Sequence, residues 1–207
     1  GRVLNVGSVR LPFIRLCVIL PCIMSTGCGK SAPSRFYLIE PVMVEGENMQ
    51  REEGERCTSI GVGPIQIPGY LDRQQIVTRP GPNRLDLAEF DKWAEPLEES
   101  LSRAIAENLE TELCTQPVAI FPWRSSRDVE YHVIMDILRL DGSLGKKAVL
   151  HVRWRLLDRE GRLIRADRSY YAQQVQDETY QAMAQAMSSL VRDFSRDVGQ
   201  AITAVIE

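Results

Sequence analysis

Cysteine thiols are the side chains of this sequence best placed for covalent chemistry. Cysteine stands at five positions: Cys17, Cys22, Cys28, Cys57 and Cys114. Cys28 follows three small residues, Ser25, Thr26 and Gly27. In bacterial lipoproteins a cysteine in this setting carries diacylglycerol on its thiol, and a peptidase cuts the chain before it. We therefore predict that Cys28 is a lipidation site. Cleavage by the ordinary signal peptidase at the same small residues is the alternative.

The segment before Cys28 has the pattern of a secretory signal peptide. Arg10 and Arg15 supply positive charge, and Leu16–Met24 is an apolar run of nine residues. Such a run suits a signal peptide, whereas a membrane-spanning helix needs about 20 apolar residues. The stretch Ser25–Cys28 then resembles a bacterial lipobox, although serine stands at its first position, where leucine is usual.

These features divide the chain into three predicted parts. Residues 1–27 form a lipoprotein signal peptide, residues 28–33 a lipidated tether and residues 34–207 a periplasmic domain. The residue after the lipidated cysteine is Gly29, not the aspartate that commonly marks retention in the inner membrane. We therefore expect a lipid anchor that faces the periplasm, in the outer membrane. The inner membrane is the alternative, because Lys30-Ser31 is a pair that some bacteria use for retention there.

Cys57 and Cys114 are the two thiols that remain once the leader is removed and Cys28 is acylated. Exported proteins reside where disulfides are permitted. A bridge across their separation of 57 residues would contribute about 4 kcal/mol at most by the loop-entropy argument. Two buried free cysteines, which pack like small apolar groups, are the alternative. The sequence leaves both arrangements open.

Catalytic and metal-binding patterns are missing from the sequence. His132 and His151 fall within expected strands, and no flanking motif supplies the neighbour that would orient a general base. The cysteines contain no paired spacing of the kind that zinc sites use. We therefore expect no catalytic site, no metal and no cofactor. Residues 28–207 carry a net charge of −6, which argues against a nucleic-acid partner because phosphate binding needs a basic face.

Arginine is concentrated in one expected hairpin. Six arginines lie within it or at its turn: Arg153, Arg155, Arg159, Arg162, Arg165 and Arg168. We expect these side chains to pair with the acidic residues of the rest of the chain. The alternative is a contact with anionic lipid headgroups or with an acidic partner.

The elements that must position these residues are strands with two helices among them. Alternating or β-branched runs predict strands at 36–39, 57–67, 76–79, 84–90, 118–121, 131–138, 149–157 and 163–175, with a turn beginning at Asp141-Gly142. Apolar residues at helical spacing predict helices from Pro96 to Leu113 and from Glu178 to Ile206. This order predicts an α+β fold in a single domain, with two helices packed on one face of a mostly antiparallel sheet.

Two strings of residues are not dictated by turn chemistry or by burial. One is Tyr70–Arg79, which reads Tyr-Leu-Asp-Arg-Gln-Gln-Ile-Val-Thr-Arg, and the other is Trp93–Leu97, which reads Trp-Ala-Glu-Pro-Leu. Together with Pro122-Trp123 and Asp141-Gly142, they resemble the PqiC family, the auxiliary lipoproteins of ABC-type and MCE-type lipid transport systems. The resemblance covers residues 34–206. Gln74 departs from it, because the family commonly has proline there.

The resemblance implies a binding role instead of an enzymatic one. Members are lipid-anchored periplasmic components that dock on an MCE-domain transporter protein and help move phospholipid between membranes, which preserves envelope integrity. A homo-oligomeric ring would suit a tunnel-shaped partner. An exposed Tyr70-Leu71 pair beside Asp72 and Arg73 would offer an anchor ringed by charge, so we expect these residues to contact the partner.

Two other functions of the chain stay open beside this one. An envelope adaptor for secretion or for the cell wall would have another stable partner, and a periplasmic hydrolase would turn over an ester or a glycan. Tyr70 could equally serve as core packing, and we expect Trp93 to be buried.

Overall fold

The computed structural model describes residues 32–42, 57–123 and 129–206, which belong to one compact unit of the chain. The predicted signal peptide and Cys28 lie outside the described residues. The elements follow in the order β1 (Arg35–Tyr37), β2 (Ile60–Gln66), β3 (Gln75–Gly81), β4 (Arg84–Trp93), α1 (Leu97–Glu112), β5 (Ala119–Ile120), β6 (Tyr131–Gly142), β7 (Lys147–Asp158), β8 (Leu163–Gln174) and α2 (Tyr180–Ile206).

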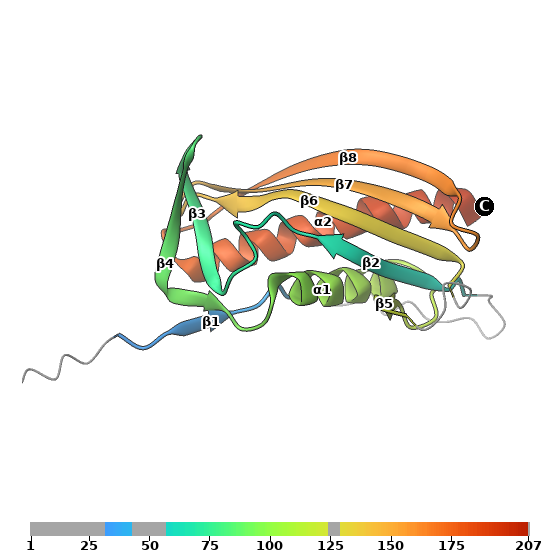
Figure 1. The fold of residues 1–207 in the computed structure, drawn as a ribbon, viewed down its shortest axis with the longest axis horizontal. Coiled ribbons are helices and arrows are strands. Elements are labelled where there is room, and N and C mark those ends of the chain that lie inside the picture. The colour runs from blue at the N-terminus through green and yellow to red at the C-terminus, as the bar shows by residue number, and fades with distance from the viewer. Residues whose placement is uncertain (1–31, 43–56, 124–128, 207) are drawn as a thin grey trace, which may run out of the picture. The chain divides into compact units, whose positions relative to one another are not determined.

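Five strands form the larger sheet, in the order β5-β2-β6-β7-β8 (Figure 1). Strand β7 is antiparallel to its two neighbours, β6 and β8, whereas β2 is parallel to both β5 and β6. Alternation along β7 separates the two faces of this sheet. Leu150, Val152, Trp154 and Leu156 are buried on one face, while Arg153 and Arg155 are exposed on the other.

Three strands form the smaller sheet, in the order β1-β4-β3. Strands β3 and β4 make an antiparallel hairpin, and β1 runs parallel to β4, with Arg35 opposite Asp91 and Tyr37 opposite Trp93. Trp93 at the end of β4 is buried, as expected from the sequence. The first strand after the predicted tether is therefore paired along its whole length.

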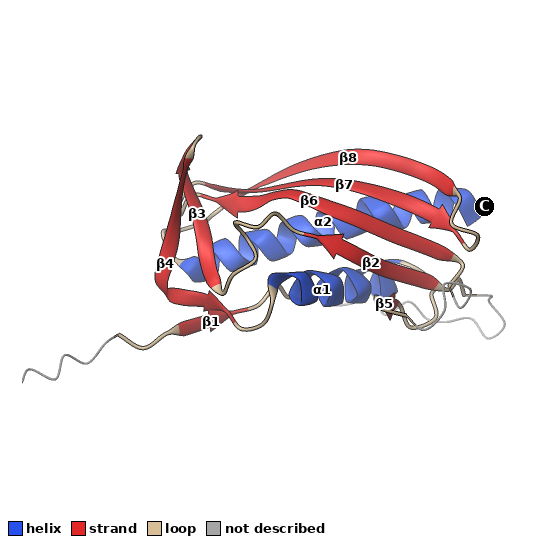
Figure 2. Ribbon diagram, viewed as in Figure 1, coloured by secondary structure: helices blue, strands red, loops and turns tan. Residues whose placement is uncertain are grey.

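Both helices lie on the same face of the larger sheet (Figure 2). Helix α1 buries Leu97, Leu101, Ile105 and Leu109 at helical spacing, and α2 buries an apolar stripe that includes Phe194. The ring of Phe194 meets the rings of Trp154 on β7 and Tyr171 on β8 edge to face, at centroid distances of 6.3 and 6.4 Å. Among the described residues, the search for a helix with the length and apolarity to cross a membrane finds none.

The α+β class and the two helices predicted from the sequence are confirmed. The strands divide between two mixed sheets, and the sequence did not indicate the parallel pairs because strand alternation carries no information on direction. Asp141-Gly142 was expected to start a turn, but both residues belong to β6. A Cβ on Gly142 would lie 2.3 Å from the carbonyl oxygen of Lys147, so β6 and β7 approach too closely there for any side chain.

The core packing leads to a first prediction. Phe194→Ala should lower the free energy of unfolding by about 3–5 kcal/mol, because it empties a fully buried aromatic position. Urea unfolding followed by circular dichroism measures the change. Val205→Ala, at an exposed side chain on the same helix, is the control and should shift the value by no more than about 0.5 kcal/mol. Equal losses in the two variants would contradict this description of the core.

Candidate functional site

The Tyr70–Arg79 string leads from the loop after β2 into β3. A tight turn forms in the loop, with the amide of Leu71 donating to the carbonyl of Pro68 at 2.8 Å. This turn directs the side chain of Leu71 into the core, where it is 2% exposed. The expectation of an exposed Tyr70-Leu71 pair is therefore wrong for Leu71. Tyr70 is half-buried, and the exposed side chains at this point are those of Asp72 and Arg73.

A fully buried carboxylate explains why Tyr70 turns inward. Asp141 accepts a hydrogen bond from the Tyr70 hydroxyl at 2.9 Å. It also accepts from Arg79 Nη2 at 2.8 Å and from Arg139 Nε at 2.7 Å. The guanidinium carbon of Arg79 lies 5.6 Å from the centroid of the Tyr70 ring. These contacts join the loop after β2, strand β3 of the smaller sheet and strand β6 of the larger one. We call these four residues the Asp141 cluster.

The electrostatics of the Asp141 cluster follow from its burial. Burial by itself would raise the pKa of Asp141, but hydrogen bonds from Arg79, Arg139 and Tyr70 outweigh it and hold that pKa below its ordinary value. Burial and the neighbouring carboxylate raise the pKa of Tyr70 to about 12. The carboxylate is thus charged and the phenol neutral across the physiological range, and neither group is poised to exchange a proton.

A second carboxylate secures the N-terminal strand. Arg35 on β1 donates to both oxygens of Asp91 on β4, from Nε and Nη2 at 2.7 Å each, and the Tyr37 hydroxyl donates to Asp91 Oδ1 at 2.7 Å. Asp91 is almost fully buried. Burial would raise its pKa, yet the bonds from Arg35 and Tyr37 lower it. These contacts between Asp91, Arg35 and Tyr37 hold β1, the first strand after the predicted tether, against β4.

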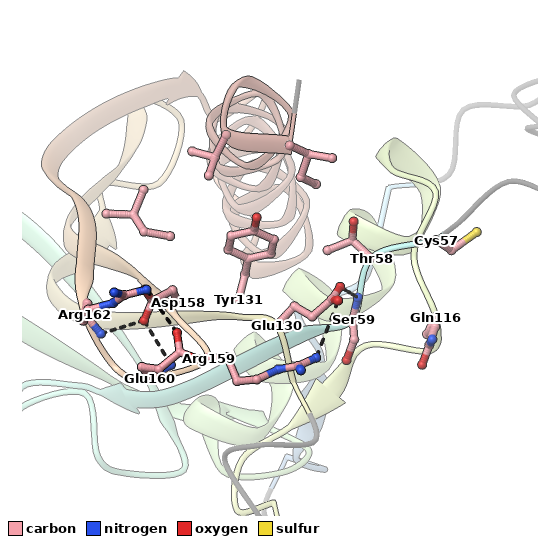
Figure 3. A pocket seen from close by; sticks show the side chains of 13 residues that line it. Cys57, Thr58, Ser59, Gln116, Glu130, Tyr131, Asp158, Arg159, Glu160 and Arg162 are labelled. Atoms are coloured by element: carbon pink, nitrogen blue, oxygen red, sulfur yellow. Dashed lines mark hydrogen bonds and ion pairs between the residues drawn. The ribbon is translucent and has the colours of Figure 1, made fainter.

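A pocket lies where β6 begins, beside the turn between β7 and β8 and the C-terminal end of α2 (Figure 3). Its volume is about 970 Å³. The lining is mainly polar, with a few apolar side chains. The residues that line the pocket are Cys57, Thr58, Ser59, Gln116, Glu130, Tyr131, Asp158, Arg159, Glu160, Arg162, Ile164, Val205 and Ile206.

Ion pairs occupy the charged groups of this pocket. Arg159 Nη2 lies 3.5 Å from Glu130 Oε1, and Glu130 Oε2 accepts the backbone amide of Ser59 at 3.2 Å. Arg162 donates to Asp158 at 2.7 Å and to Glu160 at 3.2 Å (Figure 3). Histidine does not occur among the lining residues, and the carboxylates are engaged by arginines or backbone amides. The charged side chains that line the pocket are therefore held by one another or by the backbone.

A disulfide joins Cys57 to Cys114 next to this pocket, with a Cα–Cα distance of 4.9 Å. It links the residues before β2 to the end of α1. Backbone hydrogen bonds from Thr58 to Cys114 and from Gln116 to Thr58 run beside it. Of the two arrangements that the sequence leaves open, the structure contains the bridge.

Neither histidine sits in a catalytic arrangement. His132 is buried with its ring 5.1 Å from that of Trp123, and burial lowers its pKa. His151 is half-exposed beside the Tyr170 ring. Within the described part of the chain, the search for clusters of three or more His, Cys, Asp or Glu side chains able to hold a metal finds none.

The six arginines of the β7–β8 hairpin divide into two groups. Four of them form ion pairs, as expected: Arg153 with Asp136, Arg159 with Glu130, Arg162 with Asp158 and Arg165 with Asp167. Arg155 and Arg168 are exposed, and within the described ranges no carboxylate comes within 4.0 Å of either. The sequence indicates all six arginines. It does not show which of them have an acidic partner, because that depends on which strands lie side by side.

The sequence of the domain matches one family of proteins. The model of the family described as "ABC-type transport auxiliary lipoprotein component" matches residues 37–199, so this chain belongs to that family. The resemblance to the PqiC family noted in the sequence is thereby confirmed.

Two relatives support the assignment, and two solved structures share the fold. The chain is 24% identical to the intermembrane transport lipoprotein PqiC of Escherichia coli over 89% of its length and 95% of the relative's, and it matches the Shigella flexneri protein of the same name equally well. In fold it is similar to a crystal structure of an uncharacterized protein, with a TM-score of 0.67 and 18% identity over 83% of this chain and 99% of that one. A Xanthomonas campestris protein follows, with a TM-score of 0.58 and 18% identity over 69% of this chain and 82% of that one.

The Asp141 cluster yields a prediction about stability and pH. Asp141→Asn should lower the free energy of unfolding by about 3 kcal/mol at neutral pH, because it leaves two guanidinium groups without their counter-charge. The folded-state pKa of Asp141 lies below its ordinary value of 3.8. The contribution of the carboxylate is therefore present above that ordinary value and is lost as the pH falls through the folded-state pKa.

Urea unfolding at a series of pH values measures this effect. The difference between Asp141→Asn and the parent protein should shrink as the solution becomes more acidic than the ordinary pKa of aspartate. Asp167→Asn, which breaks an exposed pair with Arg165, is the control and should cost no more than about 1 kcal/mol. A difference that does not change with pH would rule out the proposed role of the charge.

The disulfide yields another prediction. Replacing Cys57 and Cys114 together by serine should lower the free energy of unfolding by about 2–4 kcal/mol, because the unfolded chain regains the freedom of the closed loop. In the native protein, neither thiol should react with a maleimide until a reductant is added. Labelling of both cysteines without reductant would show that the bridge is not formed in the envelope.

Proposed function

We propose that this protein is a lipid-anchored periplasmic subunit that binds an MCE-domain protein of an intermembrane phospholipid transport system. The observation that carries the proposal is the family match over residues 37–199, which spans nearly all of the described domain. The name of the 24% identical relatives, intermembrane transport lipoprotein, supports the transport role. The proposal includes lipidation of Cys28 and an anchor in the outer membrane, and it assigns the protein to the maintenance of envelope integrity.

A role in binding, without an active site, agrees with how the charged groups are used. The buried carboxylates of Asp91 and Asp141 each accept hydrogen bonds from arginine and tyrosine that join separate strands. Such groups stabilise the fold and are not free to act on a substrate. This argues against the hydrolase, whereas an adaptor for secretion or for the cell wall would differ from our proposal only in its partner.

The loop around Asp72 and Arg73 is our candidate for the contact with the partner. Both side chains are exposed, while Leu71 is buried and Tyr70 is held by Asp141. The two inner residues therefore fix the loop before binding, which reduces the entropy that the complex would lose. In this proposal, Asp72 and Arg73 make the contact, and Tyr70 and Leu71 support them.

Affinity purification from the native envelope in mild detergent tests the proposal. Mass spectrometry should find diacylglycerol on Cys28 and an MCE-domain protein in the same eluate. Double charge reversal, Asp72→Arg with Arg73→Glu, should reduce recovery of that partner at least tenfold. Arg162→Glu, an exposed substitution at the turn between β7 and β8, is the control and should leave recovery unchanged.

Three results would contradict parts of this proposal. An unmodified Cys28 would remove the anchor. The absence of any MCE-domain protein from the eluate, with another stable partner present, would favour a different adaptor. Full recovery of the partner with the doubly reversed loop would move the contact elsewhere on the domain. Sedimentation of the purified protein would show in addition whether it forms a homo-oligomer.

A further inference from the structure

The outer face of the larger sheet, which points away from the helices, carries a row of arginines. Strand register places Arg153 on β7 directly opposite Arg168 on β8, and Arg155 lies two residues further along β7. Their neighbours on the even positions of β7, such as Trp154, are buried against the helices. Alternation therefore directs these three guanidinium groups to the same side. We call Arg153, Arg155 and Arg168 the arginine strip.

The arginine strip is only partly neutralised within the domain, because one of its three members has an acidic partner. Like charges directly opposite one another destabilise an antiparallel pair, yet Arg153 and Arg168 stand in that relation. Asp136 pairs with Arg153 at 3.0 Å, but within the described ranges no carboxylate lies within 4.0 Å of Arg155 or Arg168. The other arginines of this hairpin have acidic partners, so the excess is local.

The charge of the strip contrasts with that of the chain after the predicted signal peptide. Residues 28–207 carry a net charge of −6, so acidic side chains are plentiful elsewhere. Asp141, on the same face, already holds Arg79 and Arg139 and cannot compensate the strip as well. A local positive surface can attract an anionic partner even on a protein whose net charge is negative.

Exposed apolar side chains flank the strip on β8. Tyr170, next to Arg168 on the same face, is 59% exposed, and Leu163 at the start of the strand is 60% exposed. Tyrosine and arginine are the residues that favour the boundary between water and lipid, because each joins an apolar body to a polar end. The planar guanidinium also matches the geometry of a phosphate, to which it can donate two hydrogen bonds.

We infer that the arginine strip binds anionic phospholipid headgroups at a membrane surface. The inference needs only that the protein works at the cell envelope, as a member of its lipoprotein family, and it does not depend on the MCE partner of the proposed function. Binding places phosphate groups between Arg153 and Arg168 and against Arg155, which removes the repulsion across the two strands. Tyr170 lies at the level of the headgroups beside them.

Vesicle sedimentation tests this inference. The mature chain, residues 28–207 with Cys28→Ser so that no acyl chain holds it, should bind vesicles that contain phosphatidylglycerol and leave vesicles of phosphatidylcholine alone. Binding should weaken as salt is added, because the charges are exposed. Each arginine near an anionic surface contributes about a fivefold gain, so Arg155→Glu with Arg168→Glu should reduce binding at least tenfold.

Arg196→Glu on α2 is the matched control, because it reverses an exposed arginine on the helical side of the domain and should leave vesicle binding unchanged. Thermal unfolding checks that every variant is folded. Equal binding to both kinds of vesicle, or full binding by the double variant, would overturn the inference. A third result would also overturn it: the protein does not bind vesicles, and the double variant no longer co-purifies with the transporter protein. That result would assign the strip to an acidic protein partner. Co-elution of an MCE-domain protein tests the proposed function separately.

Discussion

A single buried carboxylate sets the relation between the two sheets. Asp141 belongs to β6 of the larger sheet, and its donors come from the loop after β2, from β3 of the smaller sheet and from β6 itself. A charge without water is tolerated only where opposite charge and hydrogen bonds surround it. The hairpin of β3 and β4 must therefore stay against the end of β6. Gly142 completes the arrangement, since any side chain there would push β7 away.

This constraint explains several of the residues on which the sequence resemblance rests. Tyr70, Arg79 and Asp141 are far apart in the sequence, and they meet in one hydrogen-bonded cluster. Leu71, from the same string, fills the core. The string is thus explained largely by the requirements of folding. The residues left for binding are those that these interactions hold in place at the surface.

The two faces of the larger sheet have different roles: one packs against the helices, and the other carries the arginine strip. On the inner face, apolar side chains such as Trp154 pack on the helices and supply most of the hydrophobic burial. The outer face receives no helix. Its arginine strip is exposed, whereas Asp141 at one end of the face is buried by Tyr70 and by Arg79 of the smaller sheet. Arginines that lack acidic partners on this face destabilise the strands slightly. A contact with an anionic surface outside the domain would offset that cost.

The sequence by itself determined the secondary elements, the α+β class and the family. Strand alternation, helical spacing and the Tyr70–Arg79 string are local properties that can be seen without a structure. It named the arginines of the hairpin and expected Trp93 in the core. Only the tertiary structure decided that the strands form two sheets, that Leu71 points inward and that Cys57 and Cys114 meet. These outcomes depend on which distant segments come together, and that is set by burial and charge pairing across the whole domain.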